Sequence, residues 1–155
     1  MRVLVIGAGV IGSIYGWALA ESGHHVLHFV RSGRAAALRD GIVLDLFDRR
    51  KGHKRNFRGV YRLNAVETLP PTNTVELVIV PVKHYELVPT LREIVPLFNV
   101  AEFLLLTQNW RGVEEIDSIL PRPRYIYGGC EGRRNIFVRH PRRGSERCGH
   151  RFAGR

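Results

Sequence analysis

The chain has 155 residues, of which 45% are hydrophobic and 25% are charged. This composition is typical of a soluble globular protein, and the length suits a single domain with a sizeable core. No apolar run approaches the length that crosses a membrane. The amino terminus is an apolar run without a basic leader, so we expect no signal peptide and a cytoplasmic location.

The net charge of +10 is concentrated toward the carboxyl terminus. Residues 1–128 hold 16 basic and 12 acidic residues, whereas residues 129–155 hold 8 arginines and 2 glutamates. Both cysteines, Cys130 and Cys148, lie in the second segment, and two cysteines do not make a disulfide framework. We therefore expect a folded domain over residues 1–128 and an irregular basic tail over residues 129–155.

The first twenty-three residues predict a strand, a glycine-rich turn and a helix. The apolar run Met1–Ile6 is rich in β-branched residues, and Ser13–Ser22 suits a helix that Gly23 ends. Between them stands a G-x-G-x-x-G sequence: Gly7, Ala8, Gly9, Val10, Ile11 and Gly12. In this context the motif indicates a dinucleotide-binding turn, and Gly16 extends its small-residue face by one helical turn.

Each glycine of the motif has a separate expected role. Gly7 permits a tight turn out of the strand, where a Cβ would clash. Gly9 lets the backbone approach a diphosphate, and Gly12 lets the helix lie close against the strand. The free N–H groups near Val10 and Ile11 then face the phosphates, with the positive end of the helix dipole behind them.

The second expected strand, His24–Val30, is followed by basic and hydroxyl side chains where NAD-binding folds usually place an acid. Arg31 suits bidentate binding of a 2′-phosphate, the Ser32 hydroxyl adds a donor, and Arg34 supplies a second charge. A solvated basic turn is the alternative. We expect NADP rather than NAD.

The rest of the chain alternates between helical and strand-like segments. The expected elements are a short helix over Ser32–Asp40 closed by Gly41, a strand over Ile42–Phe47, a strand over Val75–Val82, a helix over His84–Val95, a strand over Phe103–Leu106, a helix over Val113–Leu120 and a strand over Tyr125–Tyr127. This order predicts an α/β fold of Rossmann type, a doubly wound parallel sheet with right-handed crossovers.

A basic segment, Arg49–Arg62, carries lysine or arginine at seven of its fourteen positions. A nucleic-acid site is one interpretation, with Phe57 and Tyr61 as stacking residues. The other, which we favour, is an exposed hairpin whose charge protects an edge strand. The alternation of Phe57, Val60 and Leu63 is too irregular for a firm strand assignment.

Polar residues follow two later strands of the predicted sheet. Lys83 follows the strand over Val75–Val82, and Asn109 follows the strand over Phe103–Leu106. Because parallel strands end at one edge of a sheet, we expect both residues to share that edge with the glycine turn and Arg31. Lys83 is then able to donate to a substrate carboxylate or carbonyl, and Asn109 to fix a ribose.

These features resemble the N-terminal domain of the ketopantoate reductase (2-dehydropantoate 2-reductase) family. The resemblance covers residues 1 to about 128 and rests on an opening V-x-G-A-G-x-x-G, Arg31 after the second strand, Val82-Lys83, and Gln108-Asn109. It implies that the glycines and Arg31 hold NADPH. It also implies that Lys83 and Asn109 lie near the nicotinamide and its ribose as catalytic-site residues.

The resemblance further implies reduction of a 2-keto acid such as 2-dehydropantoate, a step of pantothenate biosynthesis. Trp110 stands where the family usually has glycine, which suggests a divergent subgroup. Family members also carry a helical C-terminal domain that supplies a proton-donating lysine, and this sequence has no lysine after Lys83. We therefore expect a truncated chain that binds NADPH without appreciable turnover.

The segment 129–155 admits three interpretations. The first is a basic arm that binds nucleic acid or an acidic membrane. The second is a metal site made of Cys130, His140, Cys148 and His150. The third is a segment translated out of frame. The spacing of the four ligand-type residues matches no common zinc pattern, so we expect no metal. We favour the third, because a permitted codon choice for residues 130–141, read from the second base, encodes Ala-Lys-Ala-Gly-Gly-Thr-Phe-Ser-Cys-Gly-Thr.

Two alternatives to a reductase domain remain open at this point. One is a non-catalytic NADP-binding module or sensor, and the other, less favoured, is a nucleic-acid-binding protein. The expected partner is a small 2-keto acid, with no nucleic acid and no membrane. The sequence does not fix the oligomeric state.

Overall fold

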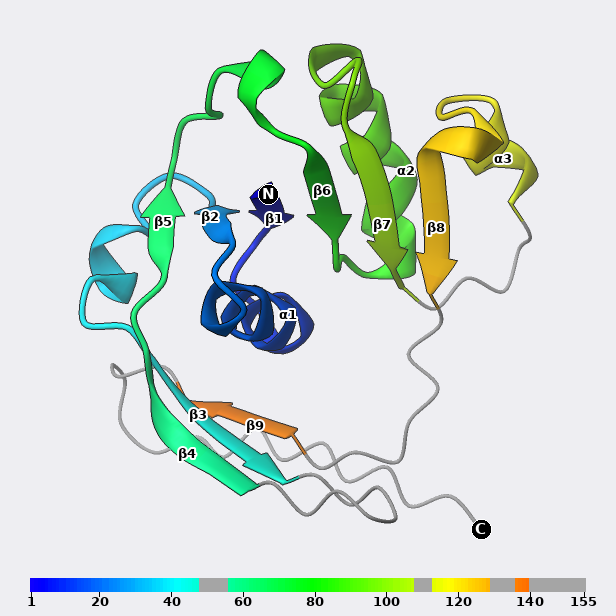
Figure 1. The fold of residues 1–155 in the computed structure, drawn as a ribbon. Helices are drawn as coiled ribbons and strands as arrows, with labels where there is room; N and C mark the ends of the chain where they lie inside the picture. Colours follow the sequence, from blue (N-terminus) through cyan, green and yellow to red (C-terminus); the bar gives the residue numbers. More distant parts are fainter. Residues whose placement is uncertain (48–55, 108–112, 129–135, 140–155) are drawn as a thin grey trace, which may run out of the picture.

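The computed structural model describes residues 1–47, 56–107, 113–128 and 136–139, and its centre is a six-stranded sheet (Figure 1). The strand order is β5-β2-β1-β6-β7-β8, and every neighbouring pair is parallel. The strands are β1 (Arg2–Ile6), β2 (His25–Phe29), β5 (Asn64–Val66), β6 (Leu77–Val80), β7 (Glu102–Leu106) and β8 (Tyr125–Gly128). The expected Rossmann-type parallel sheet is therefore confirmed.

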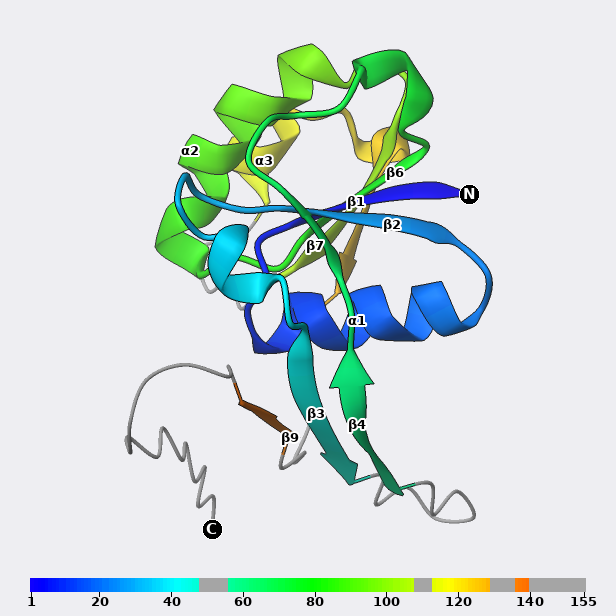
Figure 2. The same cartoon turned by 90° about the vertical axis from the view of Figure 1, so that its left-hand side faces the viewer.

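Helices cover both faces of this sheet (Figure 2). Helix α1 (Val10–Glu21) lies on one face, and α2 (His84–Ile94) and α3 (Glu114–Asp117) lie on the other. Within β1, Val3 and Val5 belong to the core cluster beneath α1, while Leu4 belongs to the cluster beneath α2. Burial on both faces explains why the central strands are apolar at nearly every position.

Four single-turn 3-10 helices complete the described helical structure. They are η1 (Ala36–Leu38), η2 (Thr72–Thr74), η3 (Val95–Leu97) and η4 (Arg122–Arg124). Two expected helices are shorter than predicted. Residues 32–40 form only η1, and residues 113–120 form only α3. In the first case Gly33 and Gly41 both adopt positive φ, which confines any helix to the residues between them.

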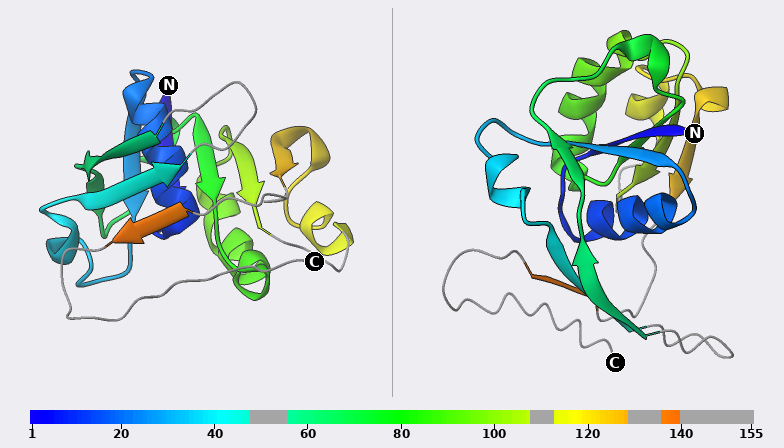
Figure 3. Two further views of the ribbon diagram at one scale, coloured as in Figure 1. Left: turned by 90° about the horizontal axis from the view of Figure 1, so that it is seen from below. Right: turned by 60° about the vertical axis from the view of Figure 1, so that its left-hand side comes forward.

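A second, antiparallel sheet packs beside α1, as both views of Figure 3 show. Its strands are β3 (Ile42–Phe47), β4 (Asn56–Tyr61) and β9 (Ile136–Arg139), in the order β4-β3-β9. The Trp17 ring of α1 lies 4.4 Å from the Phe57 ring of β4, measured between centroids. Helix α1 is therefore covered on both sides, by the parallel sheet and by the antiparallel one.

Three strands differ from the sequence-based expectation. The sequence gives no firm assignment of β4, because its apolar positions alternate irregularly, and none of β5, yet β3 and β4 form the expected hairpin. Strand β9 lies within the segment expected to be irregular and pairs with β3 over four residues. An available edge of β3 supplies the hydrogen-bond partners that this short segment lacks alone. The other residues of that segment lie outside the described residues.

Two glycines let α1 lie close to its neighbours. A Cβ at Gly12 would lie 3.1 Å from Val5 Cγ1 and 3.2 Å from the carbonyl oxygen of Gly7, so the expected close packing is confirmed. A Cβ at Gly16 would lie only 2.4 Å from Nε2 of His28, a buried residue of β2. The helix therefore approaches the sheet at a distance that larger residues would prevent.

We expect Gly16→Ala to lower the free energy of unfolding by about 1–3 kcal/mol, as overpacking does in well-packed cores. A loss of stability would be informative, because helix propensity alone favours alanine over glycine by about 1 kcal/mol and so predicts the opposite change. Urea denaturation measures the change, with Glu21→Ala on the exposed side of α1 as the control. A Gly16→Ala chain more stable than the wild type would show that the helix has room to move away from the His28 ring.

Candidate functional site

The turn after β1 presents an open, positively polarised helix start. Gly7 has φ +95°, and its N–H donates to the carbonyl of Phe29 at the end of β2, at 2.7 Å. Gly9 precedes α1 without a capping side chain, and the first turn of α1 contains no acidic residue. The first N–H groups of a helix have no intrahelical acceptor, so in α1 they remain available to an anion.

The glycines differ from the expectation at one position. A Cβ at Gly7 would meet no atom within 4 Å, so the expected clash is wrong and the positive φ is what requires glycine there. A Cβ at Gly9 would also meet no atom within 4 Å. The space beside the start of α1 is therefore not filled by the protein's own described side chains at this point.

Arg31 follows β2 and extends toward α2. Its Nη2 lies 3.3 Å from Oε1 of Glu86, in the first turn of α2. Since α2 follows β6 and β1 lies between β2 and β6, this ion pair joins elements on either side of β1. The Arg31 side chain is 88% exposed, and exposed pairs of this kind contribute at most about 1 kcal/mol. An anionic ligand that binds Arg31 more strongly would therefore displace Glu86 at little cost in free energy.

The loop after Arg31 is organised by a carboxylate from the neighbouring strand connection. Glu67 follows β5, and its Oε1 accepts a hydrogen bond from the Ala35 N–H at 2.8 Å. The backbone N–H groups of Ala35, Gly33 and Arg34 hold the pKa of Glu67 below its ordinary value. These three N–H groups are thus engaged within the protein, whereas the side chains of Arg31, Ser32 and Arg34 are exposed.

Lys83 stands immediately before α2 at the same edge of the sheet. It is exposed, and its Nζ lies 5.7 Å from the centroid of the Tyr85 ring. Its carbonyl accepts a hydrogen bond from the N–H of Glu86, the residue that pairs with Arg31. Lys83 therefore caps the helical turn whose Glu86 side chain pairs with Arg31. Asn109 and its neighbour Trp110 lie outside the described residues.

A buried hydroxyl lies at the carboxyl end of β7, close in sequence to Asn109. Thr107 is 4% exposed, and its Oγ1 has no hydrogen-bond partner in the structure as described. Its carbonyl accepts a hydrogen bond from the Tyr127 hydroxyl at 2.9 Å. Buried hydroxyls are usually paired, so Thr107 offers an unused polar group at this end of the sheet.

The ring of His28 lies beneath the glycine turn and was not identified from the sequence. Nδ1 lies 2.9 Å from the carbonyl oxygen of Gly7, and Nε2 lies 3.1 Å from the hydroxyl of Tyr61 on β4. Burial lowers the pKa of His28, which the hydrogen bond to Gly7 opposes, and burial raises the pKa of Tyr61 to about 12. Both side chains are therefore neutral near pH 7.

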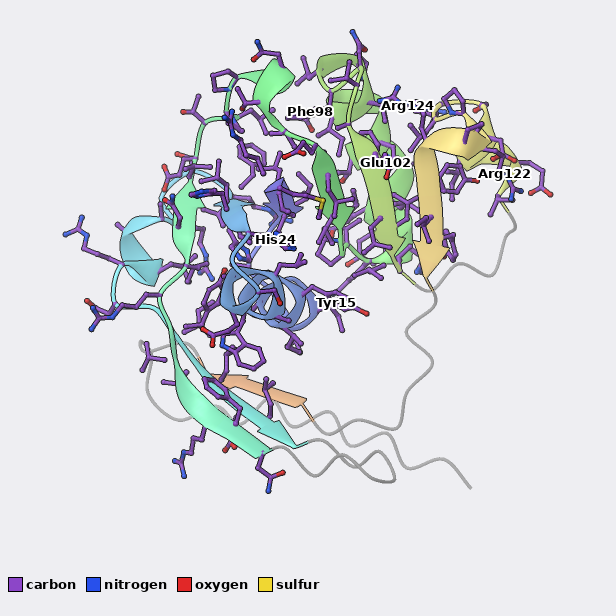
Figure 4. The ribbon with its side chains drawn as sticks, in the orientation of Figure 1. Tyr15, His24, Phe98, Glu102, Arg122 and Arg124 are labelled. Carbon is purple, nitrogen blue, oxygen red and sulfur yellow. The ribbon has the colours of Figure 1, made fainter. Side chains whose placement is uncertain are left out.

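Other basic residues lie at the end of the sheet where β7 and β8 begin; Figure 4 shows Arg124 near Phe98 and Glu102, and Arg122 at α3. Arg124 donates to the carbonyls of Phe98 and Ala101 at 2.5 and 2.9 Å. Arg122 donates to Asp117 at 2.7 Å. These arginines hold loops where β7 and β8 begin, far along the strands from the glycine turn.

Among residues 1–47, 56–107, 113–128 and 136–139, no group of three or more histidine, cysteine or acidic residues is placed to hold a metal ion. The four ligand-type residues Cys130, His140, Cys148 and His150 lie outside these ranges. In the same ranges, no helix has the length and apolarity needed to span a membrane.

Comparison with known proteins gives the family. The model of the ketopantoate reductase PanE/ApbA family matches residues 3–133. The chain belongs to this family. No significant match is found among curated proteins.

Solved structures share the fold of this ketopantoate reductase family member at low identity. D-mandelate dehydrogenase with NADH and anilino(oxo)acetate is 22% identical, with a TM-score of 0.63, over 83% of this chain and 40% of that one. A PanE/ApbA family ketopantoate reductase from Ralstonia eutropha is 23% identical, with a TM-score of 0.60, over 83% and 40%. 2-Dehydropantoate 2-reductase from Geobacter metallireducens is 19% identical, with a TM-score of 0.55, over 90% and 49%. The chain thus spans under half the length of these structures.

The buried neutral His28 predicts how the stability of this family member depends on pH. Because burial lowers the native pKa of His28, the unfolded chain binds a proton more readily once the pH falls below the ordinary value of 6.5. The folded state therefore keeps its full stability with respect to His28 above pH 6.5, and the free energy of unfolding declines as the pH falls from there toward the native pKa of His28. We expect urea denaturation between pH 7.5 and about 5 to give a shallower decline for His28→Gln than for the wild type, and equal declines would contradict this.

Proposed function

We propose that this chain binds a nicotinamide dinucleotide, NADP in preference to NAD, as the cofactor domain of a 2-keto acid reductase. The observation that carries the proposal is the uncapped start of α1, placed at the same edge of the sheet as Arg31. A helix start without acidic residues attracts a diphosphate, and a guanidinium beyond β2 attracts a further phosphate. One ligand that carries both a diphosphate and a further ribose phosphate is a dinucleotide with a 2′-phosphate.

The residues present fit such a cofactor. Gly9 leaves open space beside the N–H groups of Val10 and Ile11, where a diphosphate would be held. Gly7 and Ala8 form the turn itself, Gly12 lies in the first turn of α1, and Arg31 with Ser32 would hold the ribose phosphate. When bound, the nicotinamide supplies the hydride. The protein's own residues would then bind and orient the cofactor and the substrate and supply protons.

Lys83 and Asn109 are proposed as the catalytic-site residues. The Lys83 ammonium is exposed at the carboxyl side of β6, where it is free to donate to a substrate carboxylate or carbonyl oxygen. Asn109 would fix the nicotinamide ribose through its amide. Family membership supports a substrate such as 2-dehydropantoate and hence a step of pantothenate biosynthesis. The D-mandelate dehydrogenase structure, which holds NADH and anilino(oxo)acetate, also supports a small keto acid.

The choice of NADP over NAD rests on Arg31. With the loop N–H groups engaged by Glu67, recognition of the adenosine ribose falls to the exposed side chains of Arg31, Ser32 and Arg34. Two of the three are cationic, which suits a phosphate better than a pair of hydroxyls. Glu86 is the one nearby acid in contact with Arg31 among the described residues, and its displacement leaves Arg31 free for that phosphate.

The alternative functions are separable. A nucleic-acid-binding role would use Phe57 and Tyr61 for stacking, but Tyr61 is 7% exposed and Phe57 packs against Trp17. These aromatic faces are therefore occupied, which disfavours that role. A non-catalytic NADP module differs from a reductase domain only in turnover, which steady-state oxidation of NADPH with ketopantoate measures.

We expect Arg31→Ala to weaken NADPH binding about ten- to hundredfold, because charge-assisted hydrogen bonds to the 2′-phosphate are lost. NADH lacks that phosphate, so its affinity should change little. Titration of NADPH and NADH fluorescence measures both. The control is Arg39→Ala, which removes an exposed arginine from the turn after η1. Equal losses for the two nucleotides would place the phosphate elsewhere.

We expect Glu86→Gln to strengthen NADPH binding by up to about fivefold, since Arg31 no longer has to leave a carboxylate. NADH binding should again be unaffected. The matched control is Glu93→Gln, which removes the same charge from an exposed position on the same helix. Weaker NADPH binding in Glu86→Gln, with the control unchanged, would mean that Glu86 supports the nucleotide instead of competing with it.

A further inference from the structure

His28 is an unusual occupant of the space between β2 and α1. Its ring is fully buried, with 0% exposure, in a place where Val26 and Val30 of the same strand region bury apolar side chains. Room for the ring exists only because residue 16 of α1 is glycine, since a Cβ there would meet Nε2 at 2.4 Å. A smaller apolar residue would fill this space without that requirement, so the polar atoms of the ring need an explanation.

The two hydrogen bonds of the ring fix where its proton lies. The partner of Nδ1 is the carbonyl oxygen of Gly7, which is only an acceptor, so Nδ1 carries the hydrogen. Nε2 is then the acceptor, and the neutral Tyr61 hydroxyl, 3.1 Å away, donates to it. The hydrogen bonds therefore run in one direction, from Tyr61 on β4 through His28 on β2 to the turn after β1.

This chain of hydrogen bonds ends on the peptide unit that begins the glycine turn. In a trans peptide the C=O and the following N–H point in opposite directions. Holding the Gly7 carbonyl toward the buried His28 ring therefore directs the Ala8 N–H away from the core. Gly7 has φ +95°, and glycine is the residue with the widest choice of backbone conformation, so its peptide unit gains most from an external constraint.

We propose that His28 is a positioning residue for the diphosphate of the nucleotide, acting through the Gly7 carbonyl, and that Tyr61 holds the other side of the ring in place by donating to Nε2. The proposal rests on the proposed function, because it takes the glycine turn as the diphosphate site. It assigns a role in nucleotide binding to β4, whose residues otherwise lie outside the parallel sheet. The hairpin strand thus supports the turn through one buried side chain.

Two isosteric substitutions separate the two ring nitrogens. The amide nitrogen of asparagine reaches the place of Nδ1, so His28→Asn keeps the donor to Gly7 and loses the acceptor for Tyr61. The amide nitrogen of glutamine reaches the place of Nε2, so His28→Gln keeps a partner for Tyr61 and loses the donor to Gly7. Each variant removes one hydrogen bond from the same buried site, which makes each the control for the other.

The experiment is fluorescence titration of the full chain with NADPH and with NADH, alongside urea denaturation of each variant. We expect His28→Gln to weaken both nucleotides about three- to tenfold, the loss of one hydrogen bond, and His28→Asn to stay within about twofold of the wild type. Equal losses in the two variants, or losses that follow their stabilities, would overturn the positioning role.

A measurement on the wild type keeps the proposal testable should either variant fail to fold. The ring ¹⁵N resonances of His28 are expected to show hydrogen on Nδ1 and none on Nε2, and Tyr61→Phe should leave the hydrogen on Nδ1, because the Gly7 carbonyl still accepts it. A wild-type ring with its hydrogen on Nε2 would overturn the proposal. A wild-type chain that binds neither nucleotide would instead overturn the proposed function and the positioning role with it, whatever the ring spectrum shows.

Discussion

The close approach of α1 to the parallel sheet is the constraint on which the rest of the structure depends. Glycine at positions 12 and 16 removes the side chains that would hold the helix away from β1 and β2. The amino end of the helix consequently lies directly after β1, with its free N–H groups beside Gly9. The same approach encloses the His28 ring. One packing requirement thus determines both the candidate phosphate site and the hydrogen bonds beneath it.

The antiparallel sheet extends this arrangement on the outer side of α1. Trp17 stacks against Phe57, and Tyr61 of the same strand reaches the His28 ring. A helix enclosed between two sheets loses most of its freedom to shift, which suits a part of the molecule that must present backbone N–H groups in fixed positions. The apolar contacts fix the helix, and the buried hydrogen bonds fix the turn that precedes it.

Acidic residues at the edge of the candidate site hold both the Arg31 side chain and the backbone donors of the loop that follows it. Glu86 pairs with Arg31, and Glu67 engages the N–H groups of the following loop. The first contact is exposed and weak, whereas the second involves three backbone donors and lowers the Glu67 pKa. A phosphate would therefore compete with Glu86 more readily than with Glu67, which leaves the loop conformation intact during binding.

The sequence was sufficient for features that depend on local pattern and insufficient for those that depend on distant contacts. The strand–glycine–helix start and the alternation of later elements predicted the parallel sheet, because burial on both faces leaves continuous apolar runs. The helix expected over residues 32–40 is shorter than predicted, because Gly33 and Gly41 adopt positive φ, a backbone property that composition does not reveal. Strand β9 was not predicted because it forms by pairing with the edge of β3, which is distant in the sequence.

The contacts that sequence reasoning missed join residues from remote segments. Glu86 is 55 residues from Arg31, Glu67 is 32 residues from Ala35, and Tyr61 is 33 residues from His28. Glu86 had one usable signal, an acid in the first turn of the helix after Lys83. His28 also had a usable signal, because it is a polar residue within an otherwise apolar stretch of strand. Neither signal names the partner.

The central claim is that the first turn of α1 holds the diphosphate of a nicotinamide dinucleotide, and backbone amide NMR during titration with NADPH tests it most directly. The account predicts that the largest amide shifts fall on residues 7–12 and on residues 31–32, with small shifts in α3 and β8. Largest shifts in the β3–β4 hairpin, or no shifts in residues 7–12 at saturating NADPH, would contradict it.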